Sequence, residues 1–580
     1  MTDLRPTHHW RRPAFVASAD MRATAEARGI GPRALEVLVA RGHRSDADLV
    51  AYFDEPVAGL HDAWLLPDAE RLADRVRRAV ARGERVLVFG DFDADGLTGS
   101  TILALTLRRL GLDATVHVPD RMAEGHGLSR LAVERARAEG RSLIVTVDTG
   151  TTSIAEVALA AALGIDVLVT DHHHVPDVLP DAVAIVNPHR PGSRYPDPRL
   201  AGTGVAFKVA QLLLGELADG PAAALDLADL AVIGTVADMA PIVGENRAIA
   251  RLGLARLSTS PRPGIAALMA EAGLAPDAVT LDAIGYTLAP RLNAGGRMGD
   301  PTTASALLLA ESTAEAGPLA ASLEAANRER RAVTAEVLDA AVAAASDVSR
   351  SGEEPAIVVV GDWPVGIIGL VAGRLAERSG VPAIVVSRSV DPWRASARGS
   401  GGIDLAAAFD ACAALLERHG GHPQAAGCEL KTGAYDSFRA HILDLAAAAP
   451  APSGPEYLLD LVVPALDVDY RLHRELAILD PLGPGDPRPL IGFSGLTVGR
   501  ARLASGGHAQ LTLRKGREVL DGIAFDRADL ADIAPETVVD VVGHLASRSF
   551  GGYESLQIEV LDAAPTGSRL AAPAAVVAAG

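Results

Sequence analysis

Apolar and polar positions follow three different patterns along the chain. Up to about residue 84 the apolar positions have helical spacing, as in 34–40 and 69–79, which predicts a helical lead-in over residues 1–84. From residue 85 short apolar runs alternate with amphipathic stretches such as 101–109 and 153–161. The runs predict strands at 85–89, 114–118, 142–147, 166–170 and 182–186. Strand and helix in alternation are typical of an α/β domain with a doubly wound parallel sheet, here over residues 85–250.

The rest of the chain predicts three further parts. Residues 251–350 form a helical segment, in which 319–348 has no Pro or Gly and is long enough to connect two domains. A second α/β domain over 351–448 opens with apolar runs at 356–360 and 382–386. After an Ala/Pro/Ser/Gly-rich linker at 449–455, alternating runs at 510–514, 538–542 and 555–561 predict a small β-barrel over 456–563. The Ala/Pro-rich tail, 564–580, is expected to be disordered.

Composition and charge narrow the class of protein. The 580 residues carry a formal net charge of −19, which argues against indiscriminate coating of nucleic acid but leaves room for a local basic channel. The two cysteines, Cys412 and Cys428, are expected to be ordinary buried thiols. The N-terminus is polar, and no uninterrupted apolar run reaches the roughly 20 residues of a membrane span. We therefore expect a cytoplasmic protein without a membrane partner.

Acidic residues gather where the predicted strands end. Three carboxylates lie in Gly-Asp-Phe-Asp-Ala-Asp-Gly at 90–96, directly after the first strand. Asp148 follows the strand at 142–147, and Asp171-His172-His173 follows the strand at 166–170. Ligands of open parallel sheets bind at the carboxyl ends of the strands, so these residues should converge at one edge.

This arrangement predicts a metal site. Three carboxylates within five residues repel one another unless cations neutralise them. Carboxylates with imidazole suit Mn²⁺ or Mg²⁺, and several shared carboxylates indicate two bridged ions, which can activate water for attack on phosphorus. A calcium loop of the EF-hand type would need a terminal Glu and flanking helices. Asp148 alone could cap a helix, and His172 and His173 alone would be typical of packing or surface positions. Their position at three successive strand ends favours the metal site.

At this point the chain resembles a known family. The loop at 90–96 and the Asp171-His172-His173 run are similar to motifs of the DHH phosphoesterases. Further segments narrow the resemblance to the RecJ family of single-strand-specific 5′-to-3′ DNA exonucleases, over about residues 35–562. These segments are Ala-Asp-Met-Ala-Pro at 237–241, Gly-Glu-Asn-Arg at 244–247, Ala-Pro-Arg-Leu-Asn-Ala-Gly-Gly-Arg at 289–297 and Gly-Gly-His-Pro-Gln-Ala-Ala-Gly at 420–427.

The resemblance implies a role for particular residues. The implied ligands of two divalent cations, Mn²⁺ or Mg²⁺, are Asp91, Asp93, Asp95, Asp148, His172 and Asp238. Asp238 would reach the site from the helical stretch 227–239, and His173 would support catalysis. The second α/β domain would be the substrate-binding DHHA1 domain. Its implied substrate contacts are Ser396, Arg398 and His422, with Arg121 and Arg291 from the preceding domains. Pro364 stands where the family often has His, which affects only a local contact.

The β-barrel would be the OB-fold of the family. Such barrels bind single strands through cationic grooves and stacked aromatic rings. Its candidate contacts are Arg500, Arg502, Arg514 and Arg548, with His508 and Phe550.

The resemblance also implies the reaction. It implies a metal-dependent exonuclease that hydrolyses single-stranded DNA from the 5′ end in DNA repair and recombination. The expected protein is a monomer that binds single-stranded DNA, with a single-strand-binding protein and a helicase as further partners. Two alternatives stay open: a DHH-family nanoRNA or cyclic-dinucleotide phosphodiesterase, and a non-catalytic single-strand-binding protein.

Overall fold

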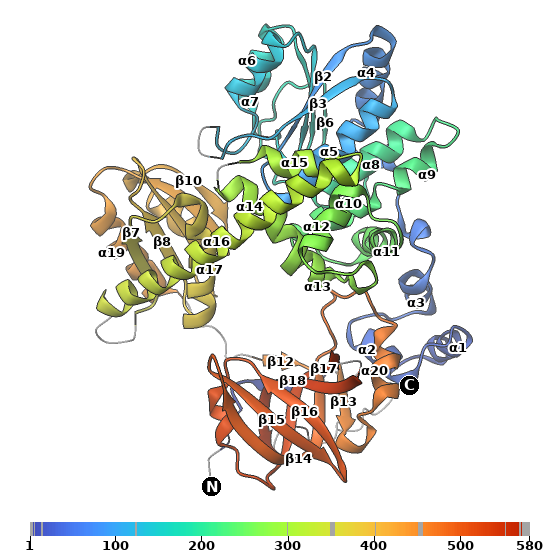
Figure 1. Ribbon diagram of the computed structural model, residues 1–580, viewed down its shortest axis with the longest axis vertical. Coiled ribbons are helices and arrows are strands. Elements are labelled where there is room, and N and C mark those ends of the chain that lie inside the picture. The colour runs from blue at the N-terminus through green and yellow to red at the C-terminus, as the bar shows by residue number, and fades with distance from the viewer. Residues whose placement is uncertain are drawn as a thin grey trace. The chain divides into compact units, whose positions relative to one another are not determined.

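The structure is a computed structural model, which describes residues 4, 6–12, 16–121, 124–298, 300–348, 354–400, 402–449, 456–550, 553–567 and 570. The chain divides into two compact units. The barrel unit comprises Met1–Gly59, Pro241–Gly244 and Ser453–Gly580, and the two-sheet unit comprises Leu60–Ala240 and Glu245–Pro452. Figure 1 labels most of the helices and strands of both.

The first sheet of the two-sheet unit has five parallel strands in the order β3-β2-β4-β5-β6. These are β2 (Arg85–Gly90), β3 (Asp113–His117), β4 (Leu143–Val147), β5 (Asp166–Thr170) and β6 (Ala184–Val186). The predicted doubly wound parallel sheet is therefore confirmed, and the direction of winding reverses between β2 and β4. A ligand site is expected at this reversal, beyond the carboxyl ends of the two strands.

Helices cover both faces of this sheet, which is why its strands read as unbroken apolar runs. Leu87 and Phe89 face a core shared with α6 (Arg130–Ala138) and α7 (Ile154–Ala162). The other face is covered by α5 (Ala94–Arg109), which packs against α8 (Gly202–Leu214) and α10 (Ala228–Ala237). The remaining helices of this region are α4 (Ala69–Arg82), α9 (Gly220–Leu225) and α11 (Gly244–Thr259).

One stretch, Gly220–Ala237, is long and apolar enough to cross a membrane by length and composition alone. In the structure it is divided between α9 and α10, and 67% of it is buried inside the protein. It is therefore accounted for as part of the core.

The long connecting helix is present as predicted. It is α16 (Thr313–Val348), which begins six residues before the Pro- and Gly-free stretch. Its first half packs against the preceding helices and its second half against α17 and β7, so it connects the two sheets of this unit. The preceding helices are α12 (Pro263–Glu271), α13 (Leu281–Ala283), a π-helix (Ile284–Leu288), α14 (Ala289–Met298) and α15 (Thr302–Leu309).

The second sheet is mixed. Its order is β10-β11-β9-β8-β7, and only β7 and β8 are parallel. α17 packs with α16 on one face, and α18 and α19 cover the other. The elements are β7 (Ile357–Gly361), α17 (Val365–Ser379), β8 (Ala383–Ser387), β9 (Trp393–Arg398), α18 (Leu405–Ala411), β10 (Leu416–His422), β11 (Ala425–Leu430) and α19 (Tyr435–Ala448). Cys412 and Cys428 are buried free thiols, as expected.

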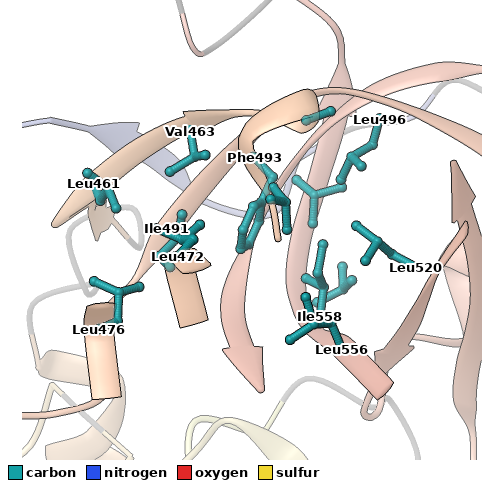
Figure 2. Packing of buried hydrophobic residues seen from close by; sticks show 14 of the residues in the cluster. Leu461, Val463, Leu472, Leu476, Ile491, Phe493, Leu496, Leu520, Leu556 and Ile558 are labelled. Carbon is teal, nitrogen blue, oxygen red and sulfur yellow. The ribbon is translucent and has the colours of Figure 1, made fainter. Parts of the chain in front are cut away.

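The barrel unit contains the predicted C-terminal barrel. β14 pairs with both β15 and β17, which closes the circuit β14-β15-β16-β18-β17. Phe493 and Leu496 of β14 meet Ile558 of β18 in its core (Figure 2). The elements are β13 (Leu461–Pro464), α20 (Tyr470–Ala477), β14 (Ile491–Ala504), β15 (His508–Lys515), β16 (Glu518–Ala524), β17 (Val538–Phe550) and β18 (Tyr553–Pro565). β18 thus runs two residues into the expected tail. Residues 568–569 and 571–580 of that tail and 450–455 of the linker lie outside the described residues.

The N-terminal lead-in differs from its prediction in two ways. It is not purely helical, because β1 (His9–Arg11) pairs in parallel with β12 (Glu456–Leu458). It is also divided: α1 (Ala19–Ala27), α2 (Pro32–Ala40) and α3 (Asp46–Phe53) belong to the barrel unit, whereas α4 belongs to the two-sheet unit. Met21, Leu38 and Leu49 share one apolar core with the barrel residues. No local pattern could reveal this, because the partners come from the opposite end of the chain.

Candidate active site

The carboxylate loop follows β2 and begins α5. Asp93 is the N-cap of α5, and its Oδ1 accepts hydrogen bonds from the amides of Asp95 (3.0 Å) and Gly96 (3.1 Å). A Cβ at Gly96 would lie 2.5 Å from the amide nitrogen of Asp91. Only glycine therefore allows the turn to close this tightly, and the closed turn holds the three carboxylates together.

Asp95 is buried and fixed by the N-terminus of α8. Its two carboxylate oxygens accept from the amides of Gly202 (2.8 Å) and Thr203 (2.7 Å). These bonds favour the charged form. Burial, followed by the charges of Asp238 and Asp93, nevertheless raises the pKa of Asp95 well above its usual value. In the absence of a cation this carboxylate would therefore tend to hold a proton.

Asp148, directly after β4, is the most constrained of these residues. It has a φ of 60°, a conformation that non-glycine residues adopt at a cost of order 1–3 kcal/mol. Its side chain is buried, and Oδ1 has no hydrogen-bond partner although Nε2 of His172 lies 3.0 Å away. Burial, and then Asp95, Asp93 and Asp91, raise the pKa of Asp148 well above its usual value. A buried acceptor without a donor is suited to a cation.

In the run after β5, Asp171 orients the backbone and the side chains of His172 and His173 extend towards the other carboxylates. Oδ1 of Asp171 accepts from the amides of His172 (2.8 Å) and His173 (3.1 Å) and lies 2.8 Å from Nδ1 of His173. Burial raises the pKa of Asp171, but the bonds from His173 and Thr151 outweigh it and hold that pKa well below its usual range. The hydrogen bond to Asp171 raises the pKa of His173 to about 9.

His172 lies at the centre of the cluster. Its Nε2 is 3.0 Å from Asp148 and 3.8 Å from Asp95, while its Nδ1 is 3.9 Å from Asp238. Burial, followed by the charge of His173, lowers the pKa of His172 to about 4, so the ring is neutral at pH 7 and able to bind a metal. Asp238 reaches it from the C-cap of α10. Burial and Asp93 raise the pKa of Asp238 to about 7.

These side chains can hold divalent cations. Each of three groups offers ligand atoms within 4.8 Å of one another: Asp148 with His172 and His173, Asp95 with His172 and Asp238, and Asp91 with Asp93 and Asp148. Asp148 and His172 each belong to two groups, as expected for adjacent ions that share ligands. The oxygen-rich donors and the unpartnered Oδ1 of Asp148 suit Mn²⁺ or Mg²⁺.

A cleft of about 700 Å³ adjoins this cluster. Arg121, His126 and His173 line one side, and Ser396, His422 and the glycines Gly420 and Gly421 line the other. The Arg121 guanidinium lies over the Phe92 ring, 4.9 Å from its centre. Beside the cleft, Nη1 of Arg398 donates to Oγ of Ser396 (3.2 Å). Guanidinium groups and a glycine pair beside a metal cluster are suited to binding a phosphate group.

Known proteins have the same parts in the same order. Residues 85–235 match the DHH family, N-terminal domain, residues 353–448 the DHHA1 domain and residues 459–562 the RecJ OB domain. The chain is 34% identical to the single-stranded-DNA-specific exonuclease RecJ of Bacillus subtilis over 546 residues, covering 92% of this chain and 68% of the relative. It is 33% identical to RecJ of Escherichia coli over 575 residues, covering 94% and 97%.

The chain belongs to the RecJ family. Among solved structures, the crystal structure of RecJ in complex with Mn²⁺ from Thermus thermophilus matches with a TM-score of 0.82 and 30% identity, covering 96% of this chain and 79% of that one. The fold of DHH, DHHA1 and OB domains that the sequence predicted is thereby confirmed.

One predicted contact of this RecJ-family site has another partner. The Nε of Arg291 donates to Glu324 of α16 (2.7 Å) and its Nη1 to the Thr287 carbonyl (2.7 Å), and its contact with phosphate stays a prediction. Arg297, six residues on, donates to the Gly366 carbonyl (3.1 Å) and interacts electrostatically with Asp93 of the metal loop. Burial, followed by Arg121 and Arg330, lowers the pKa of Arg297 to about 10. Six residues turn about 240° around a helix, so only one of the two arginines can face the metal loop.

Two further details concern α14 and α17. Asn293 of α14, which the sequence reasoning did not single out, accepts from the amide of Ala94 in the metal loop (2.7 Å). Pro364 is the N-cap of α17. Within this helix, Gly369 is the residue that lies beside Arg398. A Cβ at Gly369 would lie 3.3 Å from Nη2 of Arg398. The close approach of α17 to Arg398 is thus made at Gly369 and does not involve position 364.

The candidate contacts of the OB domain lie on β14, β15 and β17. Arg500 and Arg548 are exposed, whereas Arg502 bonds Gln510 and Arg514 bonds Glu536. His508 packs edge-on against Phe525, whose side chain is 57% exposed. Phe525 is thus an exposed aromatic on the barrel that the sequence reasoning missed. The side chain of Phe550 lies outside the described residues.

Proposed function

We propose that this chain is a metal-dependent exonuclease that hydrolyses single-stranded DNA from the 5′ end and acts in DNA repair and recombination. One observation carries the proposal: His173 of the metal cluster lines the same cleft as Arg121, Ser396 and His422. The names of the RecJ relatives, single-stranded-DNA-specific exonucleases, support the substrate.

The proposed cofactors are two divalent cations, Mn²⁺ or Mg²⁺. When bound, they supply an activated water and neutralise charge on the phosphate under attack. The residues proposed to hold them are Asp91, Asp93, Asp95, Asp148, His172 and Asp238. The crystal structures of RecJ in complex with Mn²⁺ and with Mg²⁺ support this choice.

The remaining residues bind and orient the strand. Arg121, Ser396 and Arg398 are proposed to hold the 5′-terminal phosphate, with Arg297 behind them, because guanidinium groups bind phosphate in a bidentate manner. The hydrogen bond to Asp171 raises the pKa of His173 to about 9, so this ring is protonated at pH 7 and can donate to a phosphate oxygen. His422 would lie near the scissile phosphate. The OB domain would bind the strand further along.

A labelled-substrate assay tests the proposal. With Mn²⁺ or Mg²⁺, the protein should release nucleotides from the 5′ end of single-stranded DNA and leave duplex DNA intact. A 3′-labelled strand should shorten gradually, and a 5′-labelled strand should lose its label at once. Asp148→Ala should abolish hydrolysis, whereas faster hydrolysis of a dinucleotide than of a long strand would indicate the phosphodiesterase alternative. Strand binding without hydrolysis would indicate the non-catalytic alternative.

Three finer predictions come from the resemblance alone. They are association with a single-strand-binding protein, association with a helicase, and a monomeric state. Light scattering of the purified protein tests the last, and retention of the protein on immobilised candidates tests the others. A cytoplasmic location agrees with a DNA substrate and stays a prediction.

A further inference from the structure

The segment between β3 and α6 brings an arginine and a histidine to the metal loop. Arg121 lies over the ring of Phe92 at 4.9 Å, and the ring of His126 lies 4.7 Å from the same phenyl group. Nδ1 of His126 is 3.6 Å from Oδ2 of Asp91. Both side chains line the cleft. Their positions therefore depend on the path of this segment, which contains no secondary structure of its own where it is described.

A buried carboxylate fixes that path. Glu124 lies three residues from Arg121 and two from His126, and only 5% of its side chain is exposed. Its Oε1 accepts from the amide of Asp120 (3.0 Å), and its Oε2 accepts from the hydroxyl of Ser129. Oε2 also lies 3.1 Å from Nε2 of His117. The carboxylate thus ties both ends of the segment to the last residue of β3.

The second ring nitrogen of His117 extends this network to the sheet face. Its Nδ1 lies 3.1 Å from Nη1 of Arg135 on α6, and the ring stacks on Phe89 at 5.5 Å. His117 itself is 8% exposed. The anchor is therefore built into the core, whereas the groups that it holds point into the cleft. None of the anchor residues lines the cleft, so their effect on substrate must pass through the residues of the segment that do, which are Arg121, Gly125 and His126.

We propose that Glu124, held by His117 and Ser129, is a positioning residue for Arg121 and thereby determines recognition of a 5′-terminal phosphate. This inference rests on the proposed function. Removing the carboxylate removes the two hydrogen bonds that it accepts from the Asp120 amide and the Ser129 hydroxyl, and so weakens the restraint on the segment. A phosphate contact depends on placement to within about 1 Å, and a misplacement of this size can cost up to about a hundredfold in rate.

The test compares strands that differ only in their 5′ end. Hydrolysis of 5′-phosphorylated and 5′-hydroxyl single-stranded DNA is measured for the wild type, Glu124→Ala, Glu124→Gln and Arg121→Ala, and for the double variant. Glu124→Ala should raise KM for the phosphorylated strand about tenfold, with kcat and the hydroxyl strand little changed. Glu124→Gln, which keeps one carbonyl acceptor, should fall between. Glu134→Ala, which removes an exposed carboxylate paired with Arg130 on α6, is the matched control.

The double variant separates positioning from general destabilisation. In the Arg121→Ala background, Glu124→Ala should not change further the ratio of KM values for the phosphorylated and hydroxyl strands. The thermal stabilisation of the double variant by Mn²⁺ should match that of Arg121→Ala. An equal loss on both strands, or a full additional loss in the Arg121→Ala background, would overturn the inference. A wild type that hydrolyses both strands equally would also overturn it. A wild type that hydrolyses neither would overturn the proposed function and this inference together.

Discussion

Asp148→Asn should make the metal-free protein more stable and the metal-bound protein less stable than the wild type. The wild-type carboxylate is 3% exposed, lies near four other carboxylates and has an acceptor without a donor. Asparagine has nearly the same volume but no charge. Relief of a buried, repelled charge is worth about 1–3 kcal/mol, since replacing buried charges by neutral groups is often stabilising by this amount. For a unit of this size that corresponds to about 1–4 °C in Tm.

Cations should reverse this order. A ligand at a hundred times its Kd stabilises the folded state by about 2.7 kcal/mol. The variant lacks a ligand that belongs to two of the three candidate metal groups, so it should gain far less from Mn²⁺. The variant should therefore melt above the wild type in EDTA and below it in excess Mn²⁺, and it should have no nuclease activity.

The pH dependence of the EDTA measurement has a defined sign. In the folded protein the pKa of Asp148 is raised, so below about pH 4 the side chain is neutral in both folded and unfolded chains. As pH rises towards 7, the unfolded chain ionises first and the wild type loses stability. Asp238, with a pKa of about 7, contributes in the same window to both proteins. The advantage of the variant in EDTA should therefore grow from pH 4 to pH 7.

Differential scanning fluorimetry at several pH values, with EDTA or Mn²⁺, measures both effects. Asp177→Asn, which alters an exposed carboxylate shortly after the histidine run, is the control and should melt like the wild type. A variant that melts below the wild type in EDTA, or that keeps full stabilisation by Mn²⁺, would refute the reasoning that Asp148 is a repelled metal ligand.

Three further predictions concern the rest of the site. Gly369→Ala places a Cβ 3.3 Å from Arg398 and should raise KM for single-stranded DNA about threefold to tenfold, with unchanged thermal stabilisation by Mn²⁺. The control is Gly317→Ala, whose Cβ meets nothing within 4 Å and which should leave KM unchanged. Equal kinetics of the two variants would contradict the effect on Arg398. Asn293→Ala removes the acceptor of a metal-loop amide and should lower kcat about tenfold, checked by initial rates in saturating metal. A chain of residues 60–449 should remain soluble and metal-dependent with weaker strand binding, while one that keeps the N-terminal helices should aggregate, as gel filtration would show.

The sequence predicted the first sheet and its ligand edge well, for physical reasons. Strands covered on both faces are unbroken apolar runs, and in a parallel sheet the residues that follow such runs share one edge. That argument brought Asp95, Asp148 and His172 together without any contact information. It could not find Asp238, because a helix end has no fixed relation to the sheet edge, and only the family resemblance supplied it.

Residues that act through a particular contact were harder to predict. Arg291 and Arg297 lie in the same motif, and the rotation of α14, set by tertiary packing, decides which one faces the metal loop. Glu124 lies in an irregular segment. Its three hydrogen-bond partners come from β3, from the segment itself and from the start of α6. No periodicity marks such a residue, because its neighbours are specified by the folded path and not by sequence spacing.

The pairing of β1 with β12 and the core shared by α1–α3 and the barrel determine when the N-terminal residues can fold. Met21, Leu38 and Leu49 leave the ribosome about 500 residues before the last barrel strand, which at 5–20 residues per second is a delay of about 25–100 s. Throughout that time these side chains have no core to enter. The two-sheet unit, all of whose residues lie between them, can fold first, so the N-terminal segment depends on the completed C-terminus or on chaperones to avoid aggregation.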